Sequence, residues 1–181
     1  MSVETNWYVI TGGSSSGKTK VIDYLSFLGY KTIPENARIL IDNEKSKGKT
    51  IREIRKNELE FQEKVLQMKI EIEKRLPKEK IIFFDRGIPD SIAYYHFYKA
   101  DTGHIVKASL QRRYRKIFLM EQLPFEKDDS RTENEEFVRN IQELIHKAYA
   151  NLKYEVIKVS IKPIEERAKF ILEKIKIREG N

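Results

Sequence analysis

The segment Gly12–Thr19, which reads GGSSSGKT, constrains the fold of this chain more than any other feature. It fits the pattern G-x-x-x-x-G-K-[ST], with Lys18 and Thr19 as its last two positions. The apolar, β-rich run Trp7–Thr11 stands directly before it, and an amphipathic segment begins at Lys18. This order predicts a strand, a tight turn and a helix, a unit from which parallel α/β sheets are assembled.

The chemistry of this segment predicts binding of a nucleoside triphosphate. Gly12 and Gly17 allow backbone conformations that a Cβ would forbid, so the N–H groups of residues 13–18 can converge on phosphate oxygens at a helix N-terminus. Lys18 is expected to reach the β- and γ-phosphates, and the hydroxyl of Thr19 to ligate Mg²⁺. The expected phosphate-binding residues are Gly12, Gly13, Ser14, Ser15, Ser16, Gly17, Lys18 and Thr19. The chain has no Asn-Lys-x-Asp segment, with which many GTPases read guanine, and this favours ATP.

Composition excludes several other classes. A chain of 181 residues fits one domain, or one domain with an inserted lid. The absence of cysteine excludes a disulfide scaffold, a thiolate nucleophile and a cysteine-type zinc site. The longest apolar runs have four residues, whereas a membrane-spanning helix needs about 20. The N-terminus lacks the basic start and apolar stretch of a signal peptide. We expect a cytoplasmic protein.

The charge of the chain gives only a weak indication of its partner. Lys+Arg number 35 and Asp+Glu 28, a net charge of +7, with both signs interspersed along most of the chain. Such patterns are typical of solvated helix faces. One compact basic cluster is formed by Arg112, Arg113, Arg115 and Lys116. It keeps nucleic acid open as a minority interpretation.

Apolar patterns alternate between strands and helices along the chain. The predicted strands are residues 7–11, 31–33, 81–84, 116–121 and 154–160. The predicted helices are residues 18–28, 34–43, a long one after a Thr50–Glu53 capping pair to about 76, 90–98, 104–115, 137–152 and one that starts at 163. Strands joined by helices imply right-handed crossovers and a mostly parallel sheet, so the predicted fold class is α/β.

Ligands of parallel α/β sheets bind at the carboxyl ends of the strands, and charged residues stand at two of these predicted ends. Asp85 ends an apolar strand, as a Mg²⁺-binding acid does, although a plain turn aspartate would read the same way. Arg86 could hold an anionic group of the substrate or of the transition state. Glu35 has two interpretations: a base for an acceptor hydroxyl, or the end of a capping box that begins at Thr32.

Other candidate residues carry weaker signals. Arg131 stands in an acidic stretch that is either a solvated connection or a lid that swings over the phosphates. Gln62 could read a base edge or be an ordinary exposed helical glutamine. The tyrosines at 94, 95 and 98 could line an acceptor pocket or belong to the core.

Five segments together resemble a known family of small P-loop proteins with an AAA-type ATP-binding domain. They are ITGGSSSGKT, GYKTIPENAR, FFDRGIPDSIAYY, LPFEKDDSRTE and KPIEERAKFIL. This family is similar in turn to ribosylnicotinamide kinases, thymidylate kinases and deoxynucleoside kinases. The resemblance runs from Trp7 to about Leu172.

The resemblance implies a three-layer α/β sandwich formed by one kinase-like domain, residues 1–181. Its five parallel strands would lie in the order 2-3-1-4-5, with helices on both faces and a lid at about residues 122–135. Glu35 would match the base of deoxynucleoside kinases, Asp85 and Arg86 the acidic-basic pair near the phosphates, and Arg131 a lid arginine. Phe61-Gln62 looks like a Phe-Gln step that reads the nucleobase. The chain departs from the pattern in having a single lid arginine and in reading Arg-Gly-Ile-Pro-Asp after Asp85.

The expected function is therefore a kinase that transfers the γ-phosphate of Mg-ATP to a small hydroxyl-bearing, nucleoside-like acceptor. In this hypothesis Lys18 and the loop hold the phosphates, Thr19 and Asp85 hold Mg²⁺, and Glu35 or Asp85 accepts the proton. Arg86 and Arg131 stabilise the transferred charge. Two alternatives stay open: a regulatory ATPase or GTPase switch that acts on a protein partner, and a polynucleotide 5′-kinase.

Overall fold

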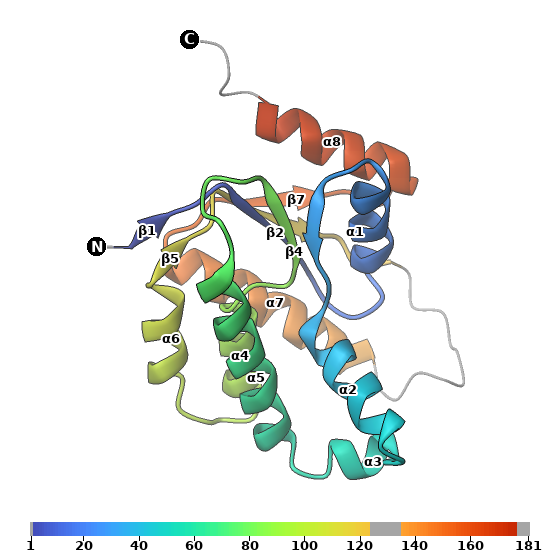
Figure 1. Cartoon of the computed structure of the whole chain (residues 1–181), viewed down its shortest axis with the longest axis vertical. Coiled ribbons are helices and arrows are strands. Elements are labelled where there is room, and N and C mark those ends of the chain that lie inside the picture. Colours follow the sequence, from blue (N-terminus) through green and yellow to red (C-terminus); the bar gives the residue numbers. More distant parts are fainter. Residues whose placement is uncertain (1, 124–134, 177–181) are drawn as a thin grey trace.

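A computed structural model of the protein describes residues 2–123 and 135–176. Five strands form a parallel sheet in the order β3-β4-β2-β6-β7, which confirms the predicted order 2-3-1-4-5. Their bounds are β2 Trp7–Thr11, β3 Lys31–Ile33, β4 Ile82–Asp85, β6 Lys116–Met120 and β7 Val156–Val159. Figure 1 shows helices on both sides of this sheet, which makes the predicted three layers. The fold is α/β, as predicted.

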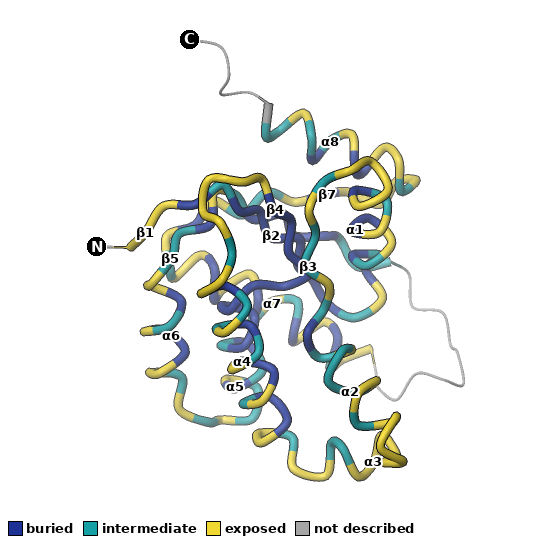
Figure 2. Tube along the Cα trace, in the orientation of Figure 1, coloured by how far each residue is buried: buried dark blue, intermediate teal, exposed yellow. Residues whose placement is uncertain are grey.

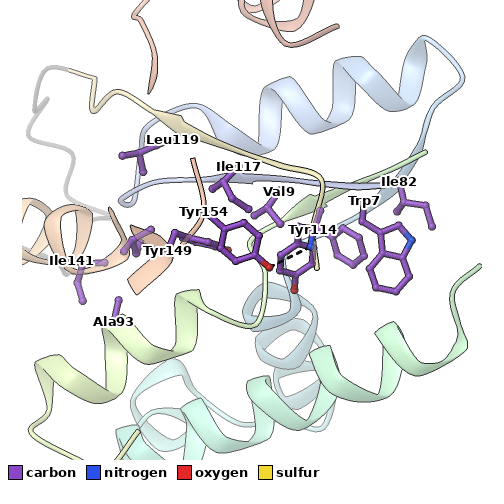
Figure 3. Packing of buried hydrophobic residues seen from close by; sticks show 12 residues of the cluster. Trp7, Val9, Ile82, Ala93, Tyr114, Ile117, Leu119, Ile141, Tyr149 and Tyr154 are labelled. Carbon is purple, nitrogen blue, oxygen red and sulfur yellow. Dashed lines mark hydrogen bonds between the residues drawn. The ribbon is translucent and has the colours of Figure 1, made fainter. Parts of the chain in front are cut away.

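The strands divide their side chains between two apolar clusters, because successive residues of a strand point to opposite faces. On one face Tyr8 and Ile10 pack with α1 (Lys18–Phe27) and α8 (Ile164–Lys176). On the other face Trp7 and Val9 pack with α5 (Asp90–Phe97) and α7 (Glu135–Asn151). Figure 2 shows β2 and β4 buried between these layers. In Figure 3 the tyrosines 114, 149 and 154 lie side by side within the second cluster, where the Tyr154 hydroxyl accepts a hydrogen bond from the Tyr114 N–H.

The remaining helices differ from the prediction in their bounds. The described ones are α2 Asn36–Ser46, α3 Ile51–Ile54, α4 Glu58–Arg75 and α6 Gly103–Ser109. Thr50 and Glu53 do form a capping box, but it begins the short helix α3 and not the long one. The long helix α4 begins after Asn57, whose side chain accepts a hydrogen bond from the Glu60 N–H.

The prediction of a helix over residues 104–115 is wrong at its C-terminal end. The helix ends at Ser109, and Arg112–Arg113 forms the short strand β5, which pairs with β1 (Val3–Glu4). The Arg113 side chain explains the change, because it lies over the Tyr154 ring and donates hydrogen bonds to the carbonyls of Leu152 and Lys153. These tertiary contacts outweigh the local helical pattern.

None of the described helices is long and apolar enough to cross a membrane. The predicted lid and its Arg131 fall mostly within residues 124–134, which lie outside the described residues.

Candidate functional site

The segment between β2 and α1 forms a tight loop that depends on its glycines. Gly12 and Gly17 have φ angles of 142° and 81°, in the region that side chains disfavour. A Cβ on Gly12 would lie 2.8 Å from the Met120 carbonyl oxygen. Lys18 is 5% exposed, and its Nζ donates hydrogen bonds to the Gly13 carbonyl at 2.7 Å and to the Ser16 hydroxyl at 3.3 Å. The loop therefore folds around the lysine, as the motif requires.

The surroundings of Lys18 weaken its hold on its proton. Burial lowers the pKa of its ammonium to about 8, and the nearby positive charge of Arg86 acts in the same direction. The acids Asp85, Glu35 and Asp90 oppose this effect. Because an anion beside the ammonium would favour its charged form, bound phosphates would restore the full charge of Lys18.

Two glutamine side chains, one from α7 and one from the segment after β6, fix the backbone of the loop. The Gly13 N–H donates to Oε1 of Gln142 in α7, and the Gln142 amide nitrogen donates to the Met120 carbonyl at 3.0 Å. The Gly13 N–H therefore donates to a side chain of the protein, whereas the sequence predicted that it would donate to a phosphate. Gln122 donates to the Ser14 carbonyl at 2.7 Å.

Arg167 of α8 connects the loop to the ends of two strands. Its guanidinium donates to the Ser16 carbonyl at 2.8 Å, the Ser160 carbonyl at 3.0 Å and the Glu121 carbonyl at 3.3 Å. The side chain is only 3% exposed. Sequence reasoning missed this residue, because nothing near it in the sequence shows that three distant carbonyls converge on one helix position.

Thr19 and Asp85 meet in the way that a magnesium site needs. The Thr19 hydroxyl donates to Oδ2 of Asp85 at 2.9 Å, and the other carboxylate oxygen of Asp85 is buried with no hydrogen-bond partner among the described residues. Burial raises the pKa of this carboxyl, while the charge of Lys18 opposes the rise. A divalent cation would satisfy the orphaned oxygen and favour the carboxylate. Mg²⁺ in phosphate sites commonly takes one or two protein ligands together with phosphates and water, so the pair fits this ion.

Glu35 and Arg86 form a salt bridge that the sequence did not reveal. Arg86 Nε donates to Glu35 Oε1 at 2.7 Å, and the arginine side chain is 5% exposed against 26% for the glutamate. Burial opposes the charge of Glu35, but Arg86 and Lys18 together hold the pKa of its carboxyl below the ordinary value. The capping-box interpretation of Glu35 is wrong, because Thr32 belongs to β3 and α2 begins only after Glu35, whose side chain makes no cap hydrogen bond.

Asp90 organises the other side of Arg86. Its two carboxylate oxygens accept hydrogen bonds from four donors: the Thr11 hydroxyl, Arg86 Nη1 at 3.2 Å, the Gly87 N–H at 3.0 Å and the Tyr149 hydroxyl at 2.6 Å. The aspartate is fully buried. Sequence reasoning missed it, although one signal was present: Asp90 follows Arg86 by four residues at the start of a predicted helix, within the distinctive segment DRGIPD.

A cleft of about 570 Å³ runs from the phosphate loop past Glu35 and Arg86 to the helices α2, α4 and α5. Phe61, Gln62 and Tyr94 also line this cleft. Gln62 is buried and donates to Glu58 at 3.0 Å, so the interpretation of an exposed glutamine is wrong. Among the three tyrosines only Tyr94 lines this cleft.

The structure thus places most of the predicted site residues together. Those that line the cleft are Ser14, Ser15, Gly17, Lys18, Thr19, Glu35 and Arg86. Asp85 reaches the site through its hydrogen bond to Thr19. The basic cluster of residues 112–116 lies elsewhere, at the amino ends of the strands, and borders a separate cavity.

The strand order and the loop between β2 and α1 define the fold of P-loop kinases, and solved structures agree. NadR protein in complex with NR is 15% identical with a TM-score of 0.72, over 98% of this chain and 51% of that chain. Deoxyadenosine kinase from M. mycoides is 14% identical with a TM-score of 0.66, over 94% and 99%. Thymidylate kinase from Ehrlichia chaffeensis is 17% identical with a TM-score of 0.64, over 94% and 97%.

The sequence itself identifies the family. A family model described as an AAA domain matches residues 7–167, and the chain belongs to this family. A sequence search of curated proteins finds no match.

Proposed function

We propose that the protein is a kinase that transfers the γ-phosphate of Mg-ATP to a hydroxyl group of a small acceptor. The observation that carries this proposal is the Glu35–Arg86 salt bridge, which stands in one cleft with the phosphate loop and with Thr19. The loop and the metal ligands would serve a nucleotide-binding switch as well as a kinase, so the ionised carboxylate of Glu35 in the same cleft is the feature that favours transfer to an acceptor hydroxyl. A kinase needs this carboxylate as a proton acceptor.

Each group of the cleft has a role in this reaction. Lys18 and the loop N–H groups bind the β- and γ-phosphates. Thr19 and Asp85 would hold Mg²⁺, which neutralises phosphate charge. Glu35 takes the proton from the acceptor hydroxyl while the acceptor oxygen forms a bond to the γ-phosphorus and the bond from that phosphorus to the β-γ bridging oxygen breaks. ADP leaves with that oxygen, and Arg86 stabilises the negative charge that is being transferred.

The basic cluster gives little support to a polynucleotide acceptor. Arg113 donates to two backbone carbonyls, and Arg115 donates to the Asn6 side chain at 3.0 Å. Both residues border the cavity at the amino ends of the strands, whereas the phosphate loop follows the carboxyl end of β2. A nucleic acid bound along this cluster would lie away from the phosphate site.

The test is ADP release from Mg-ATP with and without a deproteinised extract of small molecules. We expect ADP release to depend on the extract, because a kinase forms ADP only when an acceptor is bound to receive the phosphate. Equal release with and without the extract would favour the regulatory ATPase, and release that requires added polynucleotide would favour the 5′-kinase.

Replacing Glu35 by Gln should lower kcat by about 10²–10⁴-fold, the usual contribution of a general base, with little change in nucleotide affinity. Because the pKa of Glu35 is depressed, the wild-type rate should show no loss from protonation of Glu35 above about pH 5. Steady-state kinetics and nucleotide titration measure both effects. Glu165→Gln, at an exposed position of α8, is the control. A Glu35→Gln enzyme with wild-type kcat would exclude Glu35 as the base.

A further inference from the structure

The cleft carries more positive charge than the proposed chemistry uses. The charged side chains that line the cleft are Lys18, Lys20, Glu35, Arg38, Arg55, Lys69 and Arg86. Six of these seven described residues are cations. This excess of cations requires an explanation, because burying a charge without a partner costs free energy.

Three of the cations have an evident partner or use, and a fourth is exposed to solvent. Lys18 belongs to the phosphate loop itself, and Lys20 follows it on the exposed side of α1. Arg86 is held by Glu35 and Asp90. Arg55 donates to both carboxylate oxygens of Glu58, at 2.9 and 2.7 Å. The remaining cations, Lys69 and Arg38, have no such explanation among the described residues.

Lys69 is buried in the wall of the cleft and forms no ion pair with a carboxylate of the described residues. The residue is 5% exposed, and its Nζ donates to the Gly87 carbonyl at 2.9 Å and to the Ser91 hydroxyl at 3.3 Å. Both acceptors are neutral, and no carboxylate of the described residues forms an ion pair with Lys69. An ammonium has three N–H donors, so one remains for a group in the cleft.

The acids near Lys69 are engaged with other groups. Glu35 accepts from Arg86, and the carboxylate of Asp90 accepts from four other donors. Glu73, one turn further along α4, accepts from the Tyr114 hydroxyl, and burial raises the pKa of Glu73 to about 7. Their charges act on Lys69 only from a distance, and burial lowers the pKa of its ammonium in spite of them.

Arg38 of α2 adds positive charge to the same cleft. It lies three residues after Glu35 in the first turn of α2, it is exposed, and it lines the same cleft. The described residues provide no ion-pair partner for it. Lys69 from α4 and Arg38 from α2 therefore both line the cleft, together with the uncharged residues Phe61, Gln62 and Val65.

We infer that the acceptor carries a negatively charged group, a carboxylate or a phosphate, which binds Lys69 inside the cleft and Arg38 at its edge. This inference rests on the proposed function, which it deepens by assigning the acceptor to the anionic small molecules. A neutral acceptor would occupy the same space but would leave the ammonium of Lys69 without an ion-pair partner, so the cleft selects for an anion.

Anion binding can be measured before the acceptor is known. Each protein is first saturated with Mg·AMP-PNP, so that the phosphate loop is occupied. Inorganic phosphate or acetate is then added at constant ionic strength, and the thermal unfolding midpoint is followed. We expect at least one anion to raise the midpoint of the wild-type protein by about 2–4 °C. Lys69→Met should lose this rise and weaken the apparent anion affinity about tenfold or more.

The control is Lys74→Met, which makes the same substitution at an exposed position of the same helix. It should respond to anions as the wild type does. Lys69→Gln is the second variant in case Lys69→Met does not fold, because glutamine removes the charge but can still donate to the Gly87 carbonyl. A response to phosphate alone would indicate a phosphorylated acceptor, and a response to acetate alone a carboxylate.

Equal anion responses in the wild type and in a folded Lys69 variant would overturn the inference, as would no response of the wild type to either anion. These outcomes are separate from a failure of the proposed function. If Mg·AMP-PNP itself did not stabilise the wild-type protein, nucleotide binding and the kinase proposal would be in error. Normal stabilisation by Mg·AMP-PNP without an anion response would remove only the anionic acceptor.

Discussion

Lys18→Ala is expected to lower acceptor-dependent ADP release by about 10³-fold or more while the protein stays folded. The lysine supplies the positive charge at the β- and γ-phosphates, where charge moves during the transfer. Loss of one such group commonly costs about 10²–10³-fold, and a charged group at a transferred phosphate up to about 10⁵-fold. A coupled assay for ADP measures the loss. Normal turnover of Lys18→Ala would contradict the kinase assignment as a whole.

The stability of the same variant separates catalysis from folding. The pKa of Lys18 is about 8 in the folded protein and near 10.4 in an unfolded chain. When folding lowers the pKa of a cationic group, the charged group destabilises the folded state at any pH below the folded pKa. This destabilisation disappears as the pH rises from the folded pKa to the pKa of the unfolded chain. Lys18→Ala should therefore unfold at the same temperature as the wild type at pH 7, or at a higher one. Lys45→Ala, at an exposed site of α2, controls for the substitution.

The sequence predicted the parts of this protein that depend on local pattern. The glycines and Lys18 stand in one segment, so the phosphate loop could be located from eight residues. Continuous apolar runs marked the buried strands, and the five strands lie in the order that the family resemblance implied. Asp85 was a candidate because it ends such a strand, and its contact with Thr19 follows from the pairing of β2 with β4.

The sequence did not predict contacts between residues that are far apart along the chain. The sequence left two roles for Glu35, a helix cap or a base, because its partner Arg86 lies 51 residues away. Arg167 reaches the loop across 151 residues. A buried lysine such as Lys69 reads as an ordinary helix-surface residue until its helix is placed against a neighbouring element. Local propensity contains no information about such convergence, which depends on how the layers pack.

Asp90→Ala is expected to lower the free energy of unfolding by about 3–5 kcal/mol, the range found when one partner of a buried charge pair is removed. The substitution removes the carboxylate that accepts from four donors, and it leaves the Tyr149 hydroxyl and the Gly87 N–H buried without this acceptor. It also leaves Arg86 with Glu35 as its single carboxylate partner among the described residues. Asp23→Ala, on the exposed side of α1, should change the unfolding free energy by less than about 0.5 kcal/mol.

Activity of the Asp90 variants then shows whether the aspartate positions Arg86. Asp90→Asn keeps the shape and can still accept from Tyr149, but it loses the charge that opposes Arg86, so it should fold better than Asp90→Ala. If Asp90 positions Arg86 for the transferred phosphate, Asp90→Asn should lower kcat more than it raises the KM for ATP, because the interaction with Arg86 matters most in the transition state. Chemical denaturation and steady-state kinetics on the same preparations give both numbers. If the unfolding free energy of Asp90→Ala lies within about 1 kcal/mol of wild type, other groups replace the four hydrogen bonds in the variant. If Asp90→Asn has the wild-type kcat, the salt bridge with Glu35 is sufficient to hold Arg86 in place.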